Sequence, residues 1–302
     1  MSSVAVFFVK GFTERIFCVI LNKRGNTMKY TVQSSKYVFK NFIYLFPFAI
    51  LPAVFLAIST DEKAITEVIR TLVDGRIGQW TFSGVFRAIS VFNFGTWQSV
   101  VFGFVGIIAF IPCVALLMAL LEKHMRIGKR TFNGLWGKLN DNFLSTAGVV
   151  LLVFAIYELW SLLLAAFLFF VSRITAKAIA YAFIVIIFIA FHVLLLLAIG
   201  AIYLWLPCMQ ITGFRAVEAL SYAYQLMSPI KAKIIFVQLL VLTFTEALIC
   251  ACALFLPMAI VFKCIVAILY AGLLMIYCVR MQVVYFDCDH IDRADMVKYY
   301  QR

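Results

Sequence analysis

Charged residues are scarce in this chain of 302 residues. Asp, Glu, Lys and Arg make up 13% of it, about half of the roughly 25% that soluble domains carry. Apolar and aromatic residues make up 65%, and the mean hydropathy is +1.03. This composition excludes a soluble enzyme, a nucleic-acid-binding protein and a disordered tail. The sequence therefore predicts an all-α integral membrane protein, a polytopic helix bundle.

Recognisable catalytic motifs are also missing. The chain has no Walker loop, no HExxH, no GxSxG and no dinucleotide-binding glycine pattern, so an ATPase, a zinc protease, a hydrolase and a redox enzyme have no recognisable site. We predict no enzyme, no cofactor and no metal. One cluster of ligand-type residues, Asp287–Asp292, follows the last apolar run, and we interpret it as a solvated acidic cap.

Long apolar runs are what the sequence has in abundance. A helix of about 20 residues crosses the roughly 30 Å hydrocarbon core of a bilayer. The sequence therefore predicts six transmembrane helices: 38–59, 99–121, 143–172, 178–206, 234–262 and 264–286.

Lysine and arginine are divided unevenly between the two sides of these spans. Nineteen fall on the side of the N-terminus and seven on the other side, so the positive-inside rule predicts that both termini lie in the cytoplasm. The chain then divides into a cytoplasmic N-terminal segment 1–37, a transmembrane domain 38–286 with an extracytoplasmic loop 60–98, and a cytoplasmic tail 287–302.

The loop 60–98 contains two segments unlike a solvated linker. Apolar residues between Asp61 and Arg76 recur at helical spacing, which predicts an amphipathic helix on the outer membrane interface. The stretch 77–96 is rich in Phe and Trp, and we interpret it as a second interfacial or re-entrant piece.

The first 27 residues raise a separate hypothesis. Codons for Lys23-Arg24-Gly25 can form a purine-rich ribosome-binding site just before Met28. Met28 is therefore a hypothetical start of translation. The orientation does not depend on it, because Lys29, Lys36 and Lys40 remain on the same side.

The second half of the chain repeats features of the first. A shift of 88 residues places Phe132 on Leu220 and Glu158 on Glu246. The repeated unit is a span with a Pro-Cys pair, a basic loop, a short amphipathic helix on the inner surface, which we call an elbow helix, and an overlong span with one glutamate. A fainter third copy begins at 35–41. The Pro-Cys pairs are Pro112-Cys113 and Pro207-Cys208.

The segment before the fifth span carries a resemblance to a known family. Glu218–Tyr222, Leu226-Met227 and Lys231, with the two Pro-Cys pairs, are similar to the membrane domain attached to bacterial glycerophosphodiester phosphodiesterases and to related six-helix bacterial membrane proteins. The resemblance covers the architecture of residues 29–286 and implies a bacterial inner membrane as the location. The phosphodiesterase barrel is absent from this sequence, so the resemblance implies no such activity.

Ionisable residues in the interior of a span are costly and mark functional sites by default, and three such residues stand out. Glu158 lies in the third span, Glu246 at the matching position of the fifth, and His192 in the fourth. One interpretation places both carboxyls at equivalent positions of a shared interior, where they bind a cation or relay protons. The other gives each glutamate a hydrogen bond to a helix neighbour and a role in packing only. These neighbours are Tyr157, Ser161, Thr243 and Thr245.

A basic cluster is predicted on the inner surface between the second and third spans. Its cations flank the aromatic Trp136, an arrangement typical of segments that bind anionic lipid headgroups. The cations are Lys123, Arg126, Lys129, Arg130 and Lys138.

Two classes of function fit the sequence. The first is a non-enzymatic scaffold or accessory subunit of a membrane complex, whose partners are membrane lipids and a protein, with no nucleic acid. The alternative is a transporter or lipid-handling protein that uses Glu158, Glu246 and His192. Replacing both glutamates by glutamine separates the classes, because it abolishes a cation-coupled activity and leaves the assembly of a scaffold intact.

Overall fold

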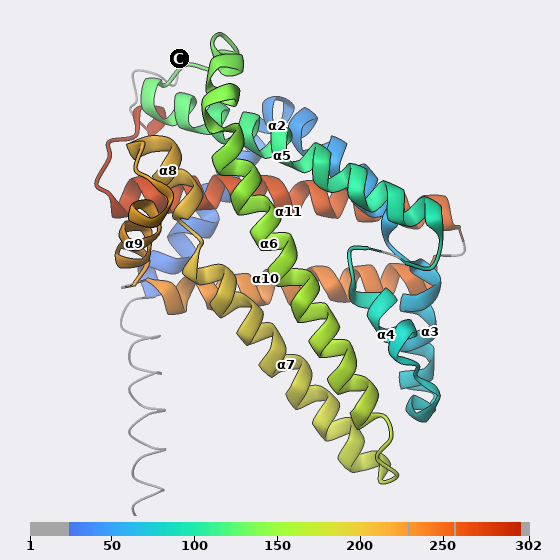
Figure 1. The fold of residues 1–302 in the computed structure, drawn as a ribbon. Helices are drawn as coiled ribbons and strands as arrows, with labels where there is room; N and C mark the ends of the chain where they lie inside the picture. The colour runs from blue at the N-terminus through green and yellow to red at the C-terminus, as the bar shows by residue number, and fades with distance from the viewer. Residues whose placement is uncertain (1–23, 93, 229, 257, 297–302) are drawn as a thin grey trace, which may run out of the picture.

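The computed structural model describes residues 24–92, 94–228, 230–256 and 258–296 of the chain. These residues fold into helices and connecting turns and contain no β-strand. Figure 1 shows long helices running between the two ends of an elongated bundle. The predicted all-α class is confirmed, and its physical reason is that a helix satisfies its backbone polar groups internally, as lipid requires.

Six helical segments are long and apolar enough to cross a membrane, which confirms the predicted number of spans. Five are single helices and one is interrupted. They are α2 (Arg24–Ser59), α5 (Trp97–Ile127), α6 (Leu135–Val171), α7 (Lys177–Ala201) continued by α8 (Trp205–Thr212), α10 (Lys231–Phe255) and α11 (Ala259–Cys288).

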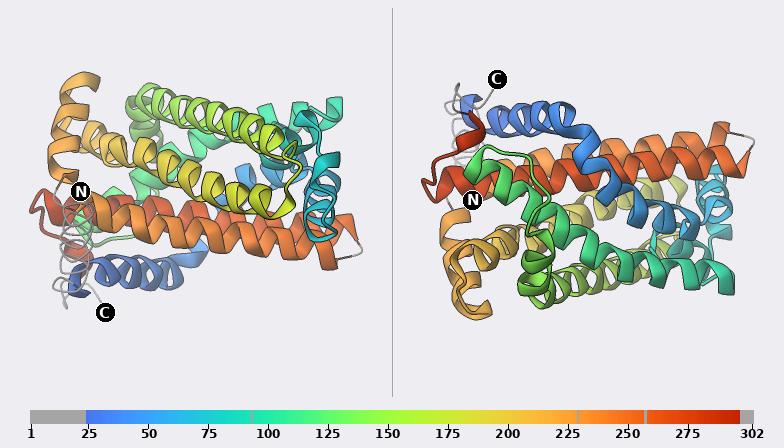
Figure 2. Two further views of the ribbon diagram at one scale, coloured as in Figure 1. Left: turned by 90° about the horizontal axis from the view of Figure 1, so that it is seen from below. Right: turned by 90° about the horizontal axis from the view of Figure 1, so that it is seen from above.

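The six spans form a ring in which each packs against the next. α2 lies along α11 and α5, α5 contacts α6, α6 contacts α7, and α7 contacts α10, which returns to α11. Figure 2 shows the two ends of the bundle. One end, called the tail end below, carries α9 (Ala216–Met227) and the residues that follow α11. The other, the α3–α4 end, carries α3 (Glu62–Val73) and α4 (Phe82–Ile89).

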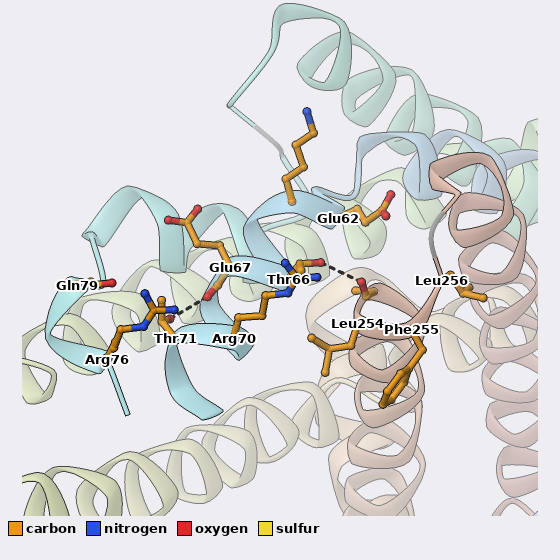
Figure 3. A pocket seen from close by; sticks show the side chains of 12 residues that line it. Glu62, Thr66, Glu67, Arg70, Thr71, Arg76, Gln79, Leu254, Phe255 and Leu256 are labelled. Atoms are coloured by element: carbon orange, nitrogen blue, oxygen red, sulfur yellow. Dashed lines mark hydrogen bonds between the residues drawn. The ribbon is translucent and has the colours of Figure 1, made fainter. Parts of the chain in front are cut away.

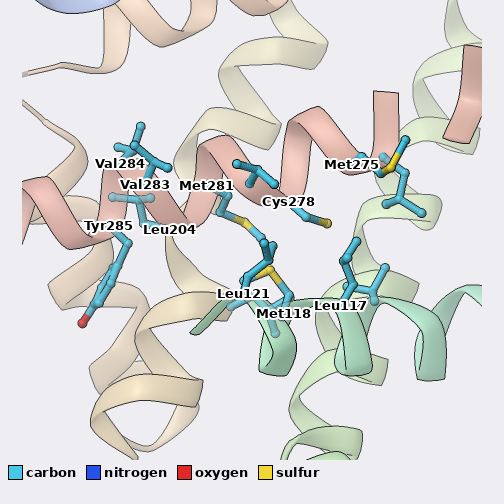
Figure 4. Packing of buried hydrophobic residues seen from close by; sticks show 14 of the residues in the cluster. Leu117, Met118, Leu121, Leu204, Met275, Cys278, Met281, Val283, Val284 and Tyr285 are labelled. Atoms are coloured by element: carbon cyan, nitrogen blue, oxygen red, sulfur yellow. The ribbon is translucent and has the colours of Figure 1, made fainter. Parts of the chain in front are cut away.

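The main hydrophobic core lies at the tail end, around the last third of α11. Every residue from Cys278 to Phe286 is buried, because α2, α5, α8 and α9 all contact α11. Figure 4 shows Met118 and Leu121 of α5 packed against Cys278 and Met281 of α11. A helix that is buried all round belongs to the interior of a bundle, and this part of α11 is its central element.

α2 and α5 approach each other closely toward the α3–α4 end. Small residues allow helix backbones in membranes to pack at short distance. A Cβ atom added at Gly106 would lie 2.9 Å from Leu56 Cδ2 and 3.2 Å from the Cβ of Phe55. The contact between α5 and α2 at Gly106 therefore leaves no room for a side chain.

The turn between the fifth and sixth spans lies earlier than predicted. α10 ends at Phe255, so the predicted fifth span is too long, and Lys263 does not lie in a loop. Lys263 lies in the second turn of α11, where its Nζ donates to the Ile58 carbonyl at 2.6 Å. The cause is in the sequence, since a proline at the next position disfavours a helical conformation of Leu256, which has φ −90° and ψ 121°.

The fourth span is interrupted where the sequence predicted one continuous helix. α7 ends at Ala201 and α8 begins at Trp205, with Tyr203 between them. Pro207 explains the break. It has no N–H to donate, and in a continuous helix its ring would clash with the carbonyl four residues earlier, which is that of Tyr203.

Short helices cover the α3–α4 end. α3 confirms the amphipathic helix predicted within Asp61–Arg76, and Asp61 caps it by accepting the Ala64 N–H at 3.1 Å. The aromatic stretch 77–96 forms a short 3-10 helix and α4. α4 packs against α6, so this stretch lies on the bundle.

The predicted elbow helices are found only in part. In the second unit, α9 is a separate helix before α10, as predicted. In the first unit, the expected elbow is no separate helix, because α6 runs without a break from Leu135. A kink at Asn41, with φ −116° and ψ 16°, divides α2 where the third copy was predicted to meet the first span.

The acidic cap predicted at Asp287–Asp292 is only partly solvated. Asp287, His290 and Asp292 are exposed, but two of the carboxylates are bonded to protein groups. Asp287 accepts a hydrogen bond from Tyr30, and Asp289 accepts one each from Tyr222 and Tyr285. These carboxylates tie α2 and α9 to the end of α11. The hydrogen bond with Asp289 raises the pKa of Tyr222 to about 12.

Two predictions remain untested by these helices. The hypothetical start at Met28 concerns residues 1–27, of which 1–23 lie outside the described residues. The assignment of both termini to the cytoplasm depends on the charge distribution alone and stays a prediction.

Candidate functional site

His192 and Glu246 form a hydrogen-bonded pair between two spans. His192 projects from α7 and Glu246 from α10. The His192 Nε2 atom lies 3.0 Å from Glu246 Oε1 and 2.9 Å from Oε2. The imidazole is fully buried, with 1% of its side chain exposed, whereas 30% of the Glu246 side chain is exposed. The structure thus brings together two of the three ionisable residues that the sequence selected.

The hydrogen bonds of this pair fix how many protons it holds. His192 Nδ1 lies 2.8 Å from the Phe188 carbonyl, which only accepts, so Nδ1 carries a hydrogen. A second proton must then lie between Nε2 and the Glu246 carboxylate, since two lone pairs would repel each other. Imidazolium with carboxylate and imidazole with carboxylic acid both satisfy this count, and both have zero net charge. The pair therefore shares one proton, and its net charge inside the membrane is zero wherever that proton lies.

Aromatic side chains surround the pair. The His192 ring lies 5.0 Å from Trp160 in an edge-to-face arrangement and 4.0 Å from Phe188. Trp160 is fixed in place because its Nε1 donates to the Phe191 carbonyl at 2.7 Å. These rings exclude water from the imidazole, which strengthens its hydrogen bonds.

Glu158 has a different environment from Glu246. Its carboxylate accepts from Ser90 Oγ at 2.7 Å and from the Val91 N–H at 2.9 Å, in the segment that follows α4. Its helix neighbour Ser161 lies 3.4 Å away. The predicted equivalence of the two carboxyls is not found, because Glu158 holds a loop onto α6 whereas Glu246 holds an imidazole.

The basic cluster at the tail end is engaged mainly with protein groups. Arg126 and Lys138 form ion pairs with Glu122 at 2.9 Å and 3.1 Å. Lys123 donates to the Asn133 carbonyl, and Arg130 lies over the ring of Tyr44, 5.4 Å from its centroid.

Two members of the cluster remain directed outward. Trp136 is 77% exposed, as expected for a side chain at a membrane interface. Lys129 is exposed and has no hydrogen bond or ion pair within the described part of the chain. The predicted role of the cluster in binding lipid headgroups therefore depends most on these two residues.

A second polar cluster was missed by the sequence reasoning. Arg280 in α11, Tyr203 between α7 and α8, and Gln238 in α10 have buried polar atoms without a hydrogen-bond partner among the described residues. Arg280 lies inside the predicted sixth span 264–286, but it was counted with the cytoplasmic Lys and Arg residues. The available signal was its position, because six further uncharged residues follow it before Asp287.

An open pocket of about 710 Å³ lies at the α3–α4 end, between α3 and the end of α10. Figure 3 shows Glu67, Arg70 and Arg76 on the side of α3 and Leu254 on the side of α10. Thr66 Oγ1 donates across it to the Ala253 carbonyl at 3.0 Å. Its two carboxylates and three cations are mixed, so the pocket selects neither sign of charge.

The fold and the six apolar spans define a multi-pass α-helical membrane protein. No protein-family model, curated protein or solved structure matches the chain. The similarity to the membrane domain of glycerophosphodiester phosphodiesterases accordingly stays a prediction. Within the described residues, no three His, Cys, Asp or Glu side chains are grouped so that they could hold a metal ion.

Proposed function

We propose that this chain is a membrane transport protein that couples transport to a proton held between His192 and Glu246. The observation that carries the proposal is the hydrogen bond between these two side chains across α7 and α10. Ionisable residues inside transmembrane segments are rare and line proton and substrate pathways. The hydrogen bond from Thr245 to Glu246 that a packing role within one helix would use is not formed, because Thr245 donates to the Val241 carbonyl.

One feature supports exchange of the proton over a permanently enclosed structural pair. Glu246 is 30% exposed, whereas His192 is enclosed, so the carboxylate is the member of the pair at which a proton can be exchanged.

Infrared difference spectroscopy of the purified protein tests the proposal. The carboxyl stretch of Glu246 is followed while the pH is varied across the range in which the protein stays folded. We expect a band that responds to pH, is lost in Glu246→Gln and shifts in His192→Asn. Glu158→Gln is the matched control, and the band should persist in it. A pair that keeps its proton at every pH would contradict a coupling role.

A second candidate function is the accessory subunit of a membrane complex. It is favoured by the use of Glu158, which serves only to hold the α4–α5 segment, and by the charged pocket beside α3. Purification in mild detergent separates the candidates, because a subunit keeps a stoichiometric protein partner. In that case Glu246→Gln leaves the partner bound.

We also propose an orientation and a membrane for this chain. We place both termini in the cytoplasm and the α3–α4 end outside a bacterial inner membrane, because of the excess of Lys and Arg at the tail end. Labelling of single introduced cysteines by an impermeant reagent tests this orientation. A cysteine in place of exposed Lys129 should be protected in intact cells, and one in place of exposed Gln79 should react.

A further inference from the structure

A buried arginine at the tail end lacks a counter-charge. The Arg280 side chain is 2% exposed, and its Nε and Nη1 atoms have no hydrogen-bond partner among the described residues. No carboxylate in the described part of the chain forms an ion pair with it. An uncompensated buried charge costs several kcal/mol, so a group that neutralises Arg280 is required.

Two further donors lie beside this arginine. Tyr203 is 2% exposed, and its hydroxyl lacks a partner among the described residues. The hydroxyl is close enough to Arg280 for an electrostatic interaction. The Gln238 amide approaches the Tyr203 hydroxyl without the geometry of a hydrogen bond, and its Nε2 is unpaired among the same residues. A guanidinium, a hydroxyl and an amide NH₂ can all donate, so the missing group is an acceptor that carries negative charge.

The break between α7 and α8 adds a structural feature to this cluster. Tyr203 lies in the break, and its ring packs edge-to-face on Tyr277 of α11, with centroids 5.3 Å apart. Interrupted helices in membrane proteins recur at binding sites, because the backbone opens there beside a cavity.

The depth of Arg280 favours the phosphate of a lipid or of a similar amphiphile. Lys263 and Arg280 are separated by about 25 Å along α11, at roughly 1.5 Å per residue. Lys263 lies at the α3–α4 end of the span, and the hydrocarbon core is about 30 Å thick. Arg280 therefore lies near the opposite border of the hydrocarbon, at the level where phospholipid headgroups begin.

We infer that Arg280, Tyr203 and Gln238 form a binding site for a phosphate group, which enters at the break between α7 and α8. The site is separate from the His192–Glu246 pair, and the inference does not depend on proton coupling. Arg280 supplies the charge, and the hydroxyl and the amide supply further hydrogen bonds to phosphate oxygens.

The experiment is ligand-induced stabilisation of the delipidated full chain in detergent. Thermal unfolding is measured with inorganic phosphate, with short-chain phosphatidylglycerol, with diacylglycerol of the same chain length, and with chloride. A phosphate site predicts stabilisation by at least one phosphate-bearing probe. Arg280→Met should weaken that affinity about tenfold to a hundredfold, as expected for a charge-assisted hydrogen bond, and Tyr203→Phe by a smaller factor. Arg215→Gln, at an exposed arginine just before α9 at the same end, is the matched control and should bind as the unmodified chain does.

The pattern among the probes decides the source of the phosphate. Stabilisation by inorganic phosphate indicates a free phosphate group, and stabilisation by phosphatidylglycerol alone indicates a lipid headgroup. An equal effect of chloride, or an effect of diacylglycerol that matches phosphatidylglycerol, overturns the inference.

The stability of Arg280→Met without ligand is a second readout. Removing an uncompensated buried charge should raise the unfolding temperature, whereas an arginine that serves the fold would leave a less stable or unfolded protein. Loss of folding in Arg280→Met therefore contradicts the inference, and Tyr203→Phe still reports on binding.

Discussion

The two sides of the helix ring differ in how they are held together. In the most apolar 18 residues of α5, 56% are buried inside the protein, against 22% in the α7–α8 span and 17% in α10. Apolar side chains gain little by leaving lipid for protein, so close packing and interhelical hydrogen bonds stabilise helix pairs in membranes. The α2–α5–α11 side has dense packing, whereas the contact between α7 and α10 includes the polar His192–Glu246 pair.

This difference indicates where the molecule can move. Segments with few buried contacts open at low free-energy cost, and moving elements are drawn from them. α7 and α10 are such segments, and both candidate sites involve them, through His192 and Glu246 in one case and through Gln238 in the other. A stable α2–α5–α11 side with a less tightly packed α7–α10 side suits a transport protein.

The largest effect is expected from a cavity on the packed side. Leu117 in α5 is fully buried in the main core. Leu117→Ala should lower the free energy of unfolding by about 2–5 kcal/mol, because it removes contacts and leaves a cavity. The measurement is reversible unfolding in mixed detergent micelles.

Leu240→Ala is the matched substitution on the loosely packed side. Leu240 lies in α10 with 56% of its surface exposed, so its loss should change stability by less than about 0.5 kcal/mol. Equal costs at the two positions would remove the contrast between the two sides.

A smaller effect is expected where α2 and α5 meet. Gly106→Val places branched carbon atoms against the side chain of Leu56 and the Cβ of Phe55 in α2, and we expect a loss of about 1–3 kcal/mol from overpacking. Gly272→Val is the control, because a Cβ at that position of α11 meets no atom within 4 Å. Its cost should be close to zero, and unfolding in the same micelles compares the two variants.

The outline of this fold could be predicted from the sequence because it depends on simple quantities. Run length and hydropathy fix the number of spans, and apolar spacing fixes α3. The proline signals were also present. The prolines explain the α10–α11 turn and the break at Tyr203. The predicted span limits followed the length of the apolar runs instead and did not take into account that proline has no N–H group.

The candidate site was predictable only in part. Rarity of charge in a span selects Glu158, Glu246 and His192, but it cannot tell which partner each will find. That depends on the packing of distant segments, as when Ser90 reaches Glu158. Arg280 was missed because its position near the end of a span looked like the start of a cytoplasmic segment.

Loss of the Glu158 contact should have a local effect of about 1 kcal/mol. Glu158→Gln weakens the hydrogen bonds that Ser90 and the Val91 N–H donate to this side chain. A charged carboxylate oxygen accepts a stronger hydrogen bond than an amide oxygen does. Hydrogen exchange at the Val91 amide should speed up several-fold. Glu246→Gln, the control, should leave this amide as protected as before, and an unchanged Val91 rate in Glu158→Gln would mean that α4 is held by its apolar contacts alone.

The smallest effect concerns the basic cluster at the tail end. Lys138 is 43% exposed and pairs with the buried carboxylate of Glu122 across α5 and α6, so Lys138→Gln should lower stability by about 0.2–1 kcal/mol, an effect that salt reduces. Lys129→Gln should leave stability unchanged, since Lys129 has no such partner among the described residues. In binding of phosphatidylglycerol to the detergent-solubilised protein the order should reverse, because only an uncommitted cation contributes its full charge, about 1 kcal/mol, to the lipid headgroups. Equal losses of lipid binding would show that pairing with Glu122 does not withdraw Lys138 from the headgroups.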